Sequence, residues 1–210
     1  DLISEQILSS GSEHITDQSI KNLMISAIYN ANVAIYDRAM ADETLAGMGT
    51  TVVAAIVSGG VAHIAHAGDS RAYLLTREGL RQITTDHSMV QELVNSGDLT
   101  TQQARRHPQK NIITRALGVE SGIEIDYCEC KFSGDDLLLL CTDGLTNYVE
   151  EEQIERLARE LEARLLPDRL IALAKSAVDT LRCEVGDYVV ISGASHLGLL
   201  IAQLAMYVRA

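Results

Sequence analysis

Three aspartates occupy the same kind of position, at the ends of apolar runs that have the composition of β-strands. Asp69 and Asp143 each follow such a run, and Asp187 opens one. Carboxylates at strand ends can converge on one edge of a sheet, where they repel one another unless a cation neutralises them. Oxygen ligands of this kind favour Mg²⁺ or Mn²⁺ over Zn²⁺. One or two such ions could activate a water molecule and bind a phosphoryl oxygen.

Each aspartate alone also has a simpler interpretation, as a turn residue. Asp beside Gly or Ser commonly forms a turn because its side chain hydrogen bonds to the backbone ahead of it, and Asp69 and Asp143 both have such neighbours. Two histidines, His63 and His66, could suggest a second metal site on one strand. Three residues apart, they are expected to point to opposite faces of that strand, which favours packing roles for both.

The aspartates need a sheet to hold them, and the chain between them predicts one. Residues 17–41 carry apolar side chains at helical spacing and are expected to form one long helix. The runs 50–58, 61–66 and 71–75 are rich in β-branched residues, and the turn signals between them predict strands joined by hairpins.

The rest of the chain predicts a flap, two further strands and covering helices. Residues 87–118 lose strand character and contain two short helical patterns, as expected of a functional flap. The later elements are expected at 123–132 and 136–141 (strands), 150–161 and 167–181 (helices), and 188–192 (strand). Because the strands group in hairpins and do not alternate with helices, the predicted class is α+β, with antiparallel sheets covered by helices.

Charge and composition exclude some partners. The net charge of −12 disfavours binding to nucleic acid, whose phosphates a negative surface repels. The most apolar stretch, 189–208, contains Ser, His, Gln and Gly, so a membrane span is not expected. The four cysteines include no C-x-x-C pair, and no signal peptide is visible, which together favour a cytoplasmic location.

Five strings, taken in order, resemble the bacterial branch of the type 2C (PPM) family of metal-dependent protein serine/threonine phosphatases. They are Gly-Met-Gly-Thr-Thr at 47–51, Ala-Gly-Asp-Ser-Arg-Ala-Tyr at 67–73, Thr-Asp-His-Ser at 85–88, the His-Pro to Leu-Gly segment at 107–118, and Leu-Cys-Thr-Asp-Gly-Leu at 140–145. The resemblance implies an α-β-β-α sandwich of two antiparallel sheets flanked by helices. It also implies hydrolysis of phosphoserine and phosphothreonine in proteins by a metal-activated water, acting on substrates of a serine/threonine kinase.

The resemblance also assigns metal ligands residue by residue. Asp143 matches a ligand of the core pair of Mg²⁺ or Mn²⁺ ions, and Asp187 takes the place of another. Asp69 and Asn111 match ligands of a third ion seen in bacterial members. No catalytic group beyond the metal ligands is expected, and the protein is expected to be a monomer.

The flap, at about 87–118, supplies the candidates for substrate contact: His87, Arg105, Arg106 and His107. The two arginines could attract a phosphorylated substrate, or could be solvated charges on a short helix. His107 could serve as an acid, but the histidine that the family is proposed to use as an acid belongs to the N-terminal strings that do not occur here.

Both ends of the sequence depart from the family pattern. The family begins with two strands that carry an Arg, an Asn-Glu-Asp string and an Asp-Gly-x-Gly-Gly-His string, and neither string occurs here. The fold is therefore expected to be incomplete at the N-terminus and the 210 residues to have weak or no activity. The alternative function is a non-catalytic phosphatase-like binding or regulatory module.

The predicted domain spans residues 1–192, and residues 193–210 form an atypical tail that is expected to be helical. The segment 186–198 resembles the strand and glycine turn of the cofactor domain of a zinc-type alcohol dehydrogenase. Its Gly-x-x-x-x-Gly spacing is too sparse for a dinucleotide fingerprint, so a nicotinamide site is not expected.

Overall fold

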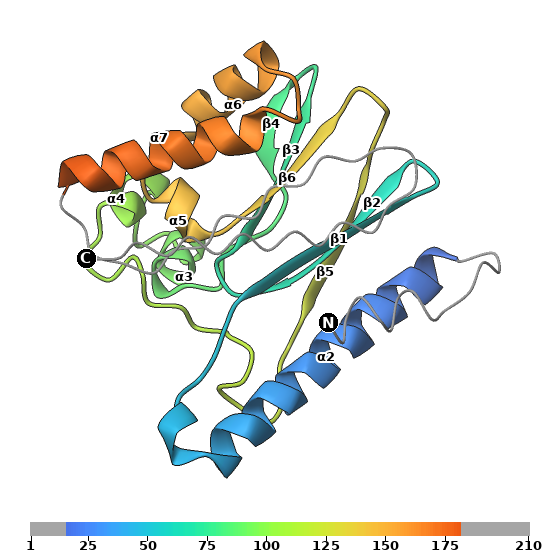
Figure 1. Cartoon of the computed structure of the whole chain (residues 1–210), viewed down its shortest axis with the longest axis vertical. Helices are drawn as coiled ribbons and strands as arrows, with labels where there is room; N and C mark the ends of the chain where they lie inside the picture. Colours follow the sequence, from blue (N-terminus) through green and yellow to red (C-terminus); the bar gives the residue numbers. More distant parts are fainter. Residues whose placement is uncertain (1–15, 182–210) are drawn as a thin grey trace.

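In the computed structural model, which describes residues 16–181, six strands form two antiparallel sheets of three strands each (Figure 1). The first sheet has the order β1-β2-β5, with β1 at Val52–Ser58, β2 at Val61–Ala67 and β5 at Asp126–Lys131. The second has the order β4-β3-β6, with β4 at Gly79–Gln82, β3 at Arg71–Thr76 and β6 at Leu137–Cys141. The strand predicted at 123–132 is shorter than expected and begins only at Asp126.

Helices cover the outer faces of both sheets. The long helix α2, Asp17–Ala41, lies along the first sheet, and its N-terminus is capped by Thr16, whose Oγ1 accepts a hydrogen bond from the Ser19 N–H at 3.2 Å (Figure 1). The helices α6, Glu151–Glu160, and α7, Leu166–Leu181, lie on the second sheet. Between residues 16 and 181, no helix combines the length and the hydrophobicity that crossing a bilayer requires.

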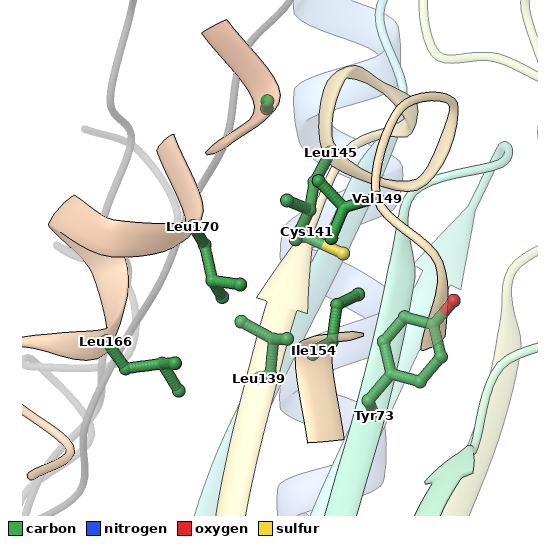
Figure 2. Close-up of a cluster of buried hydrophobic side chains, with 9 residues drawn as sticks. Tyr73, Leu139, Cys141, Leu145, Val149, Ile154, Leu166 and Leu170 are labelled. Atoms are coloured by element: carbon green, nitrogen blue, oxygen red, sulfur yellow. The ribbon is translucent and has the colours of Figure 1, made fainter. Parts of the chain in front are cut away.

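Three separate buried clusters show that the layers stack as helix, sheet, sheet, helix. One joins α2 to the first sheet, a second fills the space between the sheets, and a third joins the second sheet to its helices. Figure 2 shows the third, in which Tyr73 and Leu139 meet Ile154 and Leu170. The arrangement confirms the α-β-β-α sandwich that the resemblance implied.

The strand β6 is buried on both faces, as its unbroken run of leucines predicts. Leu138 and Leu140 belong to the cluster between the sheets, and Leu139 and Cys141 belong to the cluster under the helices. Alternate residues of a strand point to opposite faces, so β6 contributes to both of these clusters, as β3 does through Ala72 and Tyr73. Its C-terminal end is consequently held in place from both sides.

The flap leaves the second sheet after β4 and contains two short helices, α3 at Met89–Asn95 and α4 at Thr101–Arg105. Its two ends meet, because the Met89 N–H donates to the Ile112 carbonyl at 3.0 Å and a β-bridge joins Ser88 to Ile113. The chain then returns past α2 to β5. The buried Asn32 fixes this return by accepting a hydrogen bond from the Gly118 N–H at 2.8 Å.

The remaining short elements are a 3₁₀ turn at Glu43–Leu45 (η1) and the one-turn helix α5 at Asp143–Thr146. The sequence did not predict α5, because a single turn is too short to show helical periodicity. The expected strand at 188–192 and the expected boundary at 192/193 lie outside the described residues.

Candidate functional site

The turn that joins β2 to β3 carries the first candidate ligand, Asp69. Gly68 before it has φ +113°, and a Cβ at this position would lie 2.3 Å from Cγ2 of Thr51, so only glycine fits. The hydroxyl groups of Thr51 and Ser70 hydrogen bond to each other at 2.7 Å. These contacts on both sides of Asp69 fix the backbone from which its carboxylate projects.

Asp143 lies close to Asp69 because of the way β3 pairs with β6. The two strands are antiparallel, and Arg71 at the start of β3 pairs with Cys141 at the end of β6. The residues just before β3 and just after β6 therefore come to the same end of the sheet. Asp143 begins α5 there, and its Oδ2 accepts a hydrogen bond from Nδ2 of Asn147 at 3.0 Å.

Burial makes both carboxylates harder to ionise. Burial raises the pKa of Asp69 to about 6, and the charges of Asp143 and Asp86 add to the rise. Burial also raises the pKa of Asp143, against the opposing effect of its hydrogen bonds to Gly144 and Asn147. Two partly buried carboxylates that resist ionisation together are a donor set suited to a hard divalent cation, which would neutralise both.

Both aspartates line a cleft of about 150 Å³ between the second sheet and the flap. Lys110 and Asn111, on the returning arm of the flap, line the same cleft. The positive charge of Lys110 lowers the pKa of Asp143 and so acts against the effect of burial. The cleft thus places carboxylate and amide oxygens near the ammonium group of Lys110, and its donor set fits a hard divalent ion.

The other predicted flap residues occupy different places. Arg105 lines the cleft, but it forms ion pairs with Glu150 and with Glu151, the latter at 3.2 Å, which link the flap to the start of α6. Arg106 is exposed and does not line the cleft. His107 accepts a hydrogen bond at Nδ1 from the Gln109 N–H at 3.2 Å and also lies outside the cleft lining.

One further predicted residue, His87, does not line the cleft. His87 is buried, with 8% of its surface exposed, and faces Gly68. Asp187 lies outside the described residues. Of the four predicted metal ligands, the structure therefore brings together Asp69, Asp143 and Asn111.

A partly buried ion pair in the lining of the cleft was not predicted from the sequence. Arg71 donates to Asp86 from Nε at 2.9 and 3.0 Å and from Nη2 at 2.6 Å, and donates from Nη1 to the Tyr73 hydroxyl at 3.0 Å. Burial alone would lower the pKa of Arg71, but the hydrogen bonds and the charge of Asp86 raise it, so the guanidinium stays charged. Arg71 belongs to the string Gly-Asp-Ser-Arg, and Asp86 belongs to the string Thr-Asp-His-Ser. The opposite charges of these two residues were the signal that could have revealed the pair.

A comparison with family models matches residues 3–182 to the model described as Protein phosphatase 2C. The chain belongs to the protein phosphatase 2C family. Among curated relatives, the serine/threonine phosphatase stp of Listeria monocytogenes is 44% identical over 145 residues, which cover 69% of this chain and 58% of the relative. The chain therefore spans less than two thirds of that relative's length.

Solved structures of the protein phosphatase 2C family share the fold. The serine/threonine phosphatase Stp1 from Staphylococcus aureus matches with a TM-score of 0.76 and 34% identity, covering 84% of this chain and 70% of that one. The catalytic domain of the phosphatase PstP, solved in complex with two manganese ions, matches with a TM-score of 0.68 and 30% identity, covering 84% and 73%.

The raised pKa of Asp69 leads to a testable pH dependence. In the metal-free protein the folded state holds this proton more tightly than the unfolded state, so the contribution of Asp69 to stability falls as the pH rises toward about 6. A cation binds only the ionised carboxylate, so the stabilisation by Mn²⁺ is expected to be large above pH 6 and to be lost as the pH falls through about 6. The Mn²⁺-induced shift in Tm, measured by thermal unfolding above and below this pH, tests the expectation.

The variant Asp69→Asn serves as the control for this experiment. It should reduce the Mn²⁺-induced shift in Tm above pH 6 and weaken its dependence on pH. An equal shift at both pH values in the parent protein would contradict the expectation.

Proposed function

We propose that this member of the protein phosphatase 2C family hydrolyses phosphoserine and phosphothreonine in proteins at a centre that includes the cleft beneath the flap. The observation that carries the proposal is the convergence of Asp69 and Asp143 at one end of β3 and β6, opposite Lys110 and Asn111. The identity to enzymes named as serine/threonine phosphatases supports it.

In this proposal the residues of the chain hold the metal and the substrate. Asp143 and Asp69 supply carboxylate oxygens, Asn111 supplies an amide oxygen, and Asp187 is proposed as a further ligand. When bound, Mg²⁺ or Mn²⁺ ions supply an activated water and a counter-charge for the phosphoryl oxygens. Lys110 lies where its ammonium group can neutralise part of the phosphate charge. The flap provides the surface for the polypeptide around the phosphorylated residue.

The cellular setting follows from the same proposal. The substrates are proteins phosphorylated by a serine/threonine kinase, and the protein acts as a monomer. Cys128, Cys130 and Cys141 are free thiols in the structure, which supports a reducing, cytoplasmic environment. We further propose that residues 1–192 form the phosphatase domain and residues 193–210 a separate tail.

Phosphopeptide hydrolysis tests the proposed activity. The protein in its native length and the 210-residue chain are each assayed for phosphate release from a phosphothreonine peptide during a Mn²⁺ titration. Release that requires Mn²⁺ supports the proposal. Binding of the phosphopeptide without hydrolysis in both forms would favour the non-catalytic binding module instead, and the absence of both would overturn the assignment of the cleft.

A further inference from the structure

His87 holds the turn that carries Asp69 from two directions. The Gly68 N–H donates to Nδ1 of His87 at 3.0 Å, and the His87 N–H donates to the Gly68 carbonyl at 3.0 Å. Both polar groups of the Gly68 backbone are therefore bonded to one residue of the flap. Gly68 has a backbone conformation that favours glycine, so this turn benefits from external support.

The hydrogen bond from Gly68 determines which nitrogen of His87 carries the proton. A backbone N–H can only donate, so Nδ1 must accept, and the proton of the neutral ring lies on Nε2. There Nε2 faces Oδ2 of Asp126 at 3.3 Å. Arg115 donates to Oδ1 of the same carboxylate at 2.7 Å and so fixes its orientation. The carboxylate of Asp126 thus orients the ring of His87 at Nε2, and Nδ1 accepts the hydrogen bond from Gly68.

The same group could be read as a metal site, because His66, His87 and Asp126 each place one donor atom within 4.8 Å of the others. Two observations argue against that reading. The Gly68 N–H occupies the lone pair of Nδ1, and the positively charged guanidinium of Arg115 lies 3.0 Å from Nε2, where it would repel a metal cation. His66 stacks on His87 instead, with ring centroids 4.7 Å apart and an angle of 11° between the planes. The stacking holds the imidazole of His87 in place.

We propose that His87 is a positioning residue that holds the Gly68–Asp69 turn in the geometry that lets the Asp69 carboxylate bind a divalent cation. This inference rests on the proposed metal site at Asp69. His87 is also the first residue of the flap, and its carbonyl accepts a hydrogen bond from the Thr114 N–H at 2.9 Å at the other end of the flap. Through its hydrogen bonds to Gly68 and Thr114, His87 therefore connects both ends of the flap to the turn that carries Asp69.

Two substitutions separate the role of Nδ1 from that of Nε2. In His87→Asn the side-chain oxygen can occupy the position of Nδ1 and accept from the Gly68 N–H, whereas contact with Asp126 is lost. In His87→Gln the longer amide can reach the position of Nε2 and Asp126, whereas the acceptor for Gly68 is lost. Both variants remove a buried ring, so thermal unfolding of the two should show similar losses of stability.

Calorimetric Mn²⁺ binding and the exchange rate of the Gly68 amide proton are measured for both variants and the parent protein. We expect His87→Gln to weaken Mn²⁺ binding by about 10-fold or more, as loss of a supporting contact to a metal ligand does, and to speed exchange at Gly68. His87→Asn should stay close to the parent in both measurements. Equal losses in the two variants, or unchanged binding in His87→Gln, would overturn the positioning role.

These outcomes are distinguishable from failure of the proposed activity. If the parent protein binds Mn²⁺ but does not hydrolyse the phosphopeptide, the proposed activity fails, and the comparison of the two His87 variants still decides the positioning role. If the parent protein binds no Mn²⁺, the metal site and the role of His87 are both overturned.

Discussion

Under the proposed phosphatase function, replacing Asp143 with asparagine is expected to lower turnover by about 100-fold or more, because loss even of a group that only supports a metal ligand costs 10–100-fold. The substitution keeps the shape of the side chain and the hydrogen bond from Asn147, and removes only the charge that would bind the cation. Turnover and Mn²⁺ affinity are measured on the same preparation.

Without metal, the Asp143→Asn variant should be at least as stable as the parent protein, although its turnover falls. Burial raises the pKa of Asp143, so its ionised form destabilises the folded state at neutral pH. The neutral asparagine removes that cost, and the Tm without metal should equal or exceed the parent value. Asp37→Ala, an exposed aspartate on α2, is the matched control and should leave turnover unchanged. A lower metal-free Tm together with normal turnover in Asp143→Asn would contradict the assignment.

Removing Arg71 is expected to produce a large loss of stability. Arg71→Leu leaves the carboxylate of Asp86 with 10% of its side chain exposed and without its charged partner, which should cost about 3 kcal/mol in the free energy of unfolding. Gln82, which donates to Oδ1 of Asp86 at 2.9 Å, remains as a weaker partner. Urea denaturation of Arg71→Leu measures the loss.

Two further variants show whether this loss comes from the unpaired charge. The double variant Arg71→Leu/Asp86→Leu should recover part of the stability, because no unpaired charge remains. Arg77→Leu removes an arginine from the exposed ion pair with Asp135 and should change the free energy of unfolding by less than about 1 kcal/mol. Equal effects of Arg71→Leu and Arg77→Leu would show that burial of the Arg71 pair has no energetic importance.

Periodicity and turn signals were sufficient to predict the long helix and the first hairpin, whereas the two-sheet sandwich was expected from the family resemblance. The helix expected at 17–41 forms with those bounds, and the hairpin between β1 and β2 turns at Gly59 and Gly60. The expectation that His63 and His66 point to opposite faces is confirmed: His63 hydrogen bonds to Tyr127 on the α2 side, and His66 stacks on His87. Each of these features is local: it depends on residues that are neighbours along the chain or on the alternation of side chains between the two faces of a strand.

The partners of the flap side chains could not be read from the sequence, because they come from distant segments. Arg105 resembled a free cation suited to phosphate, but folding brings it to Glu150 and Glu151, which neutralise it. His87 resembled a flap residue open to substrate, but the adjacent Asp86 reaches Arg71, and the backbone carries the imidazole inward to Gly68. Local patterns identify the charge of a side chain and do not identify the tertiary contact that uses it.

The meeting of the two ends of the flap has a consequence for how such a protein can diversify. The bridge between Ser88 and Ile113 means that the segment between them leaves and re-enters the fold at one place. Its length could change at a small entropic cost, since the free energy of closing a loop grows only slowly with its length. A change in the length of this segment would therefore leave the sandwich, and the carboxylates of Asp69 and Asp143 that it positions, in place.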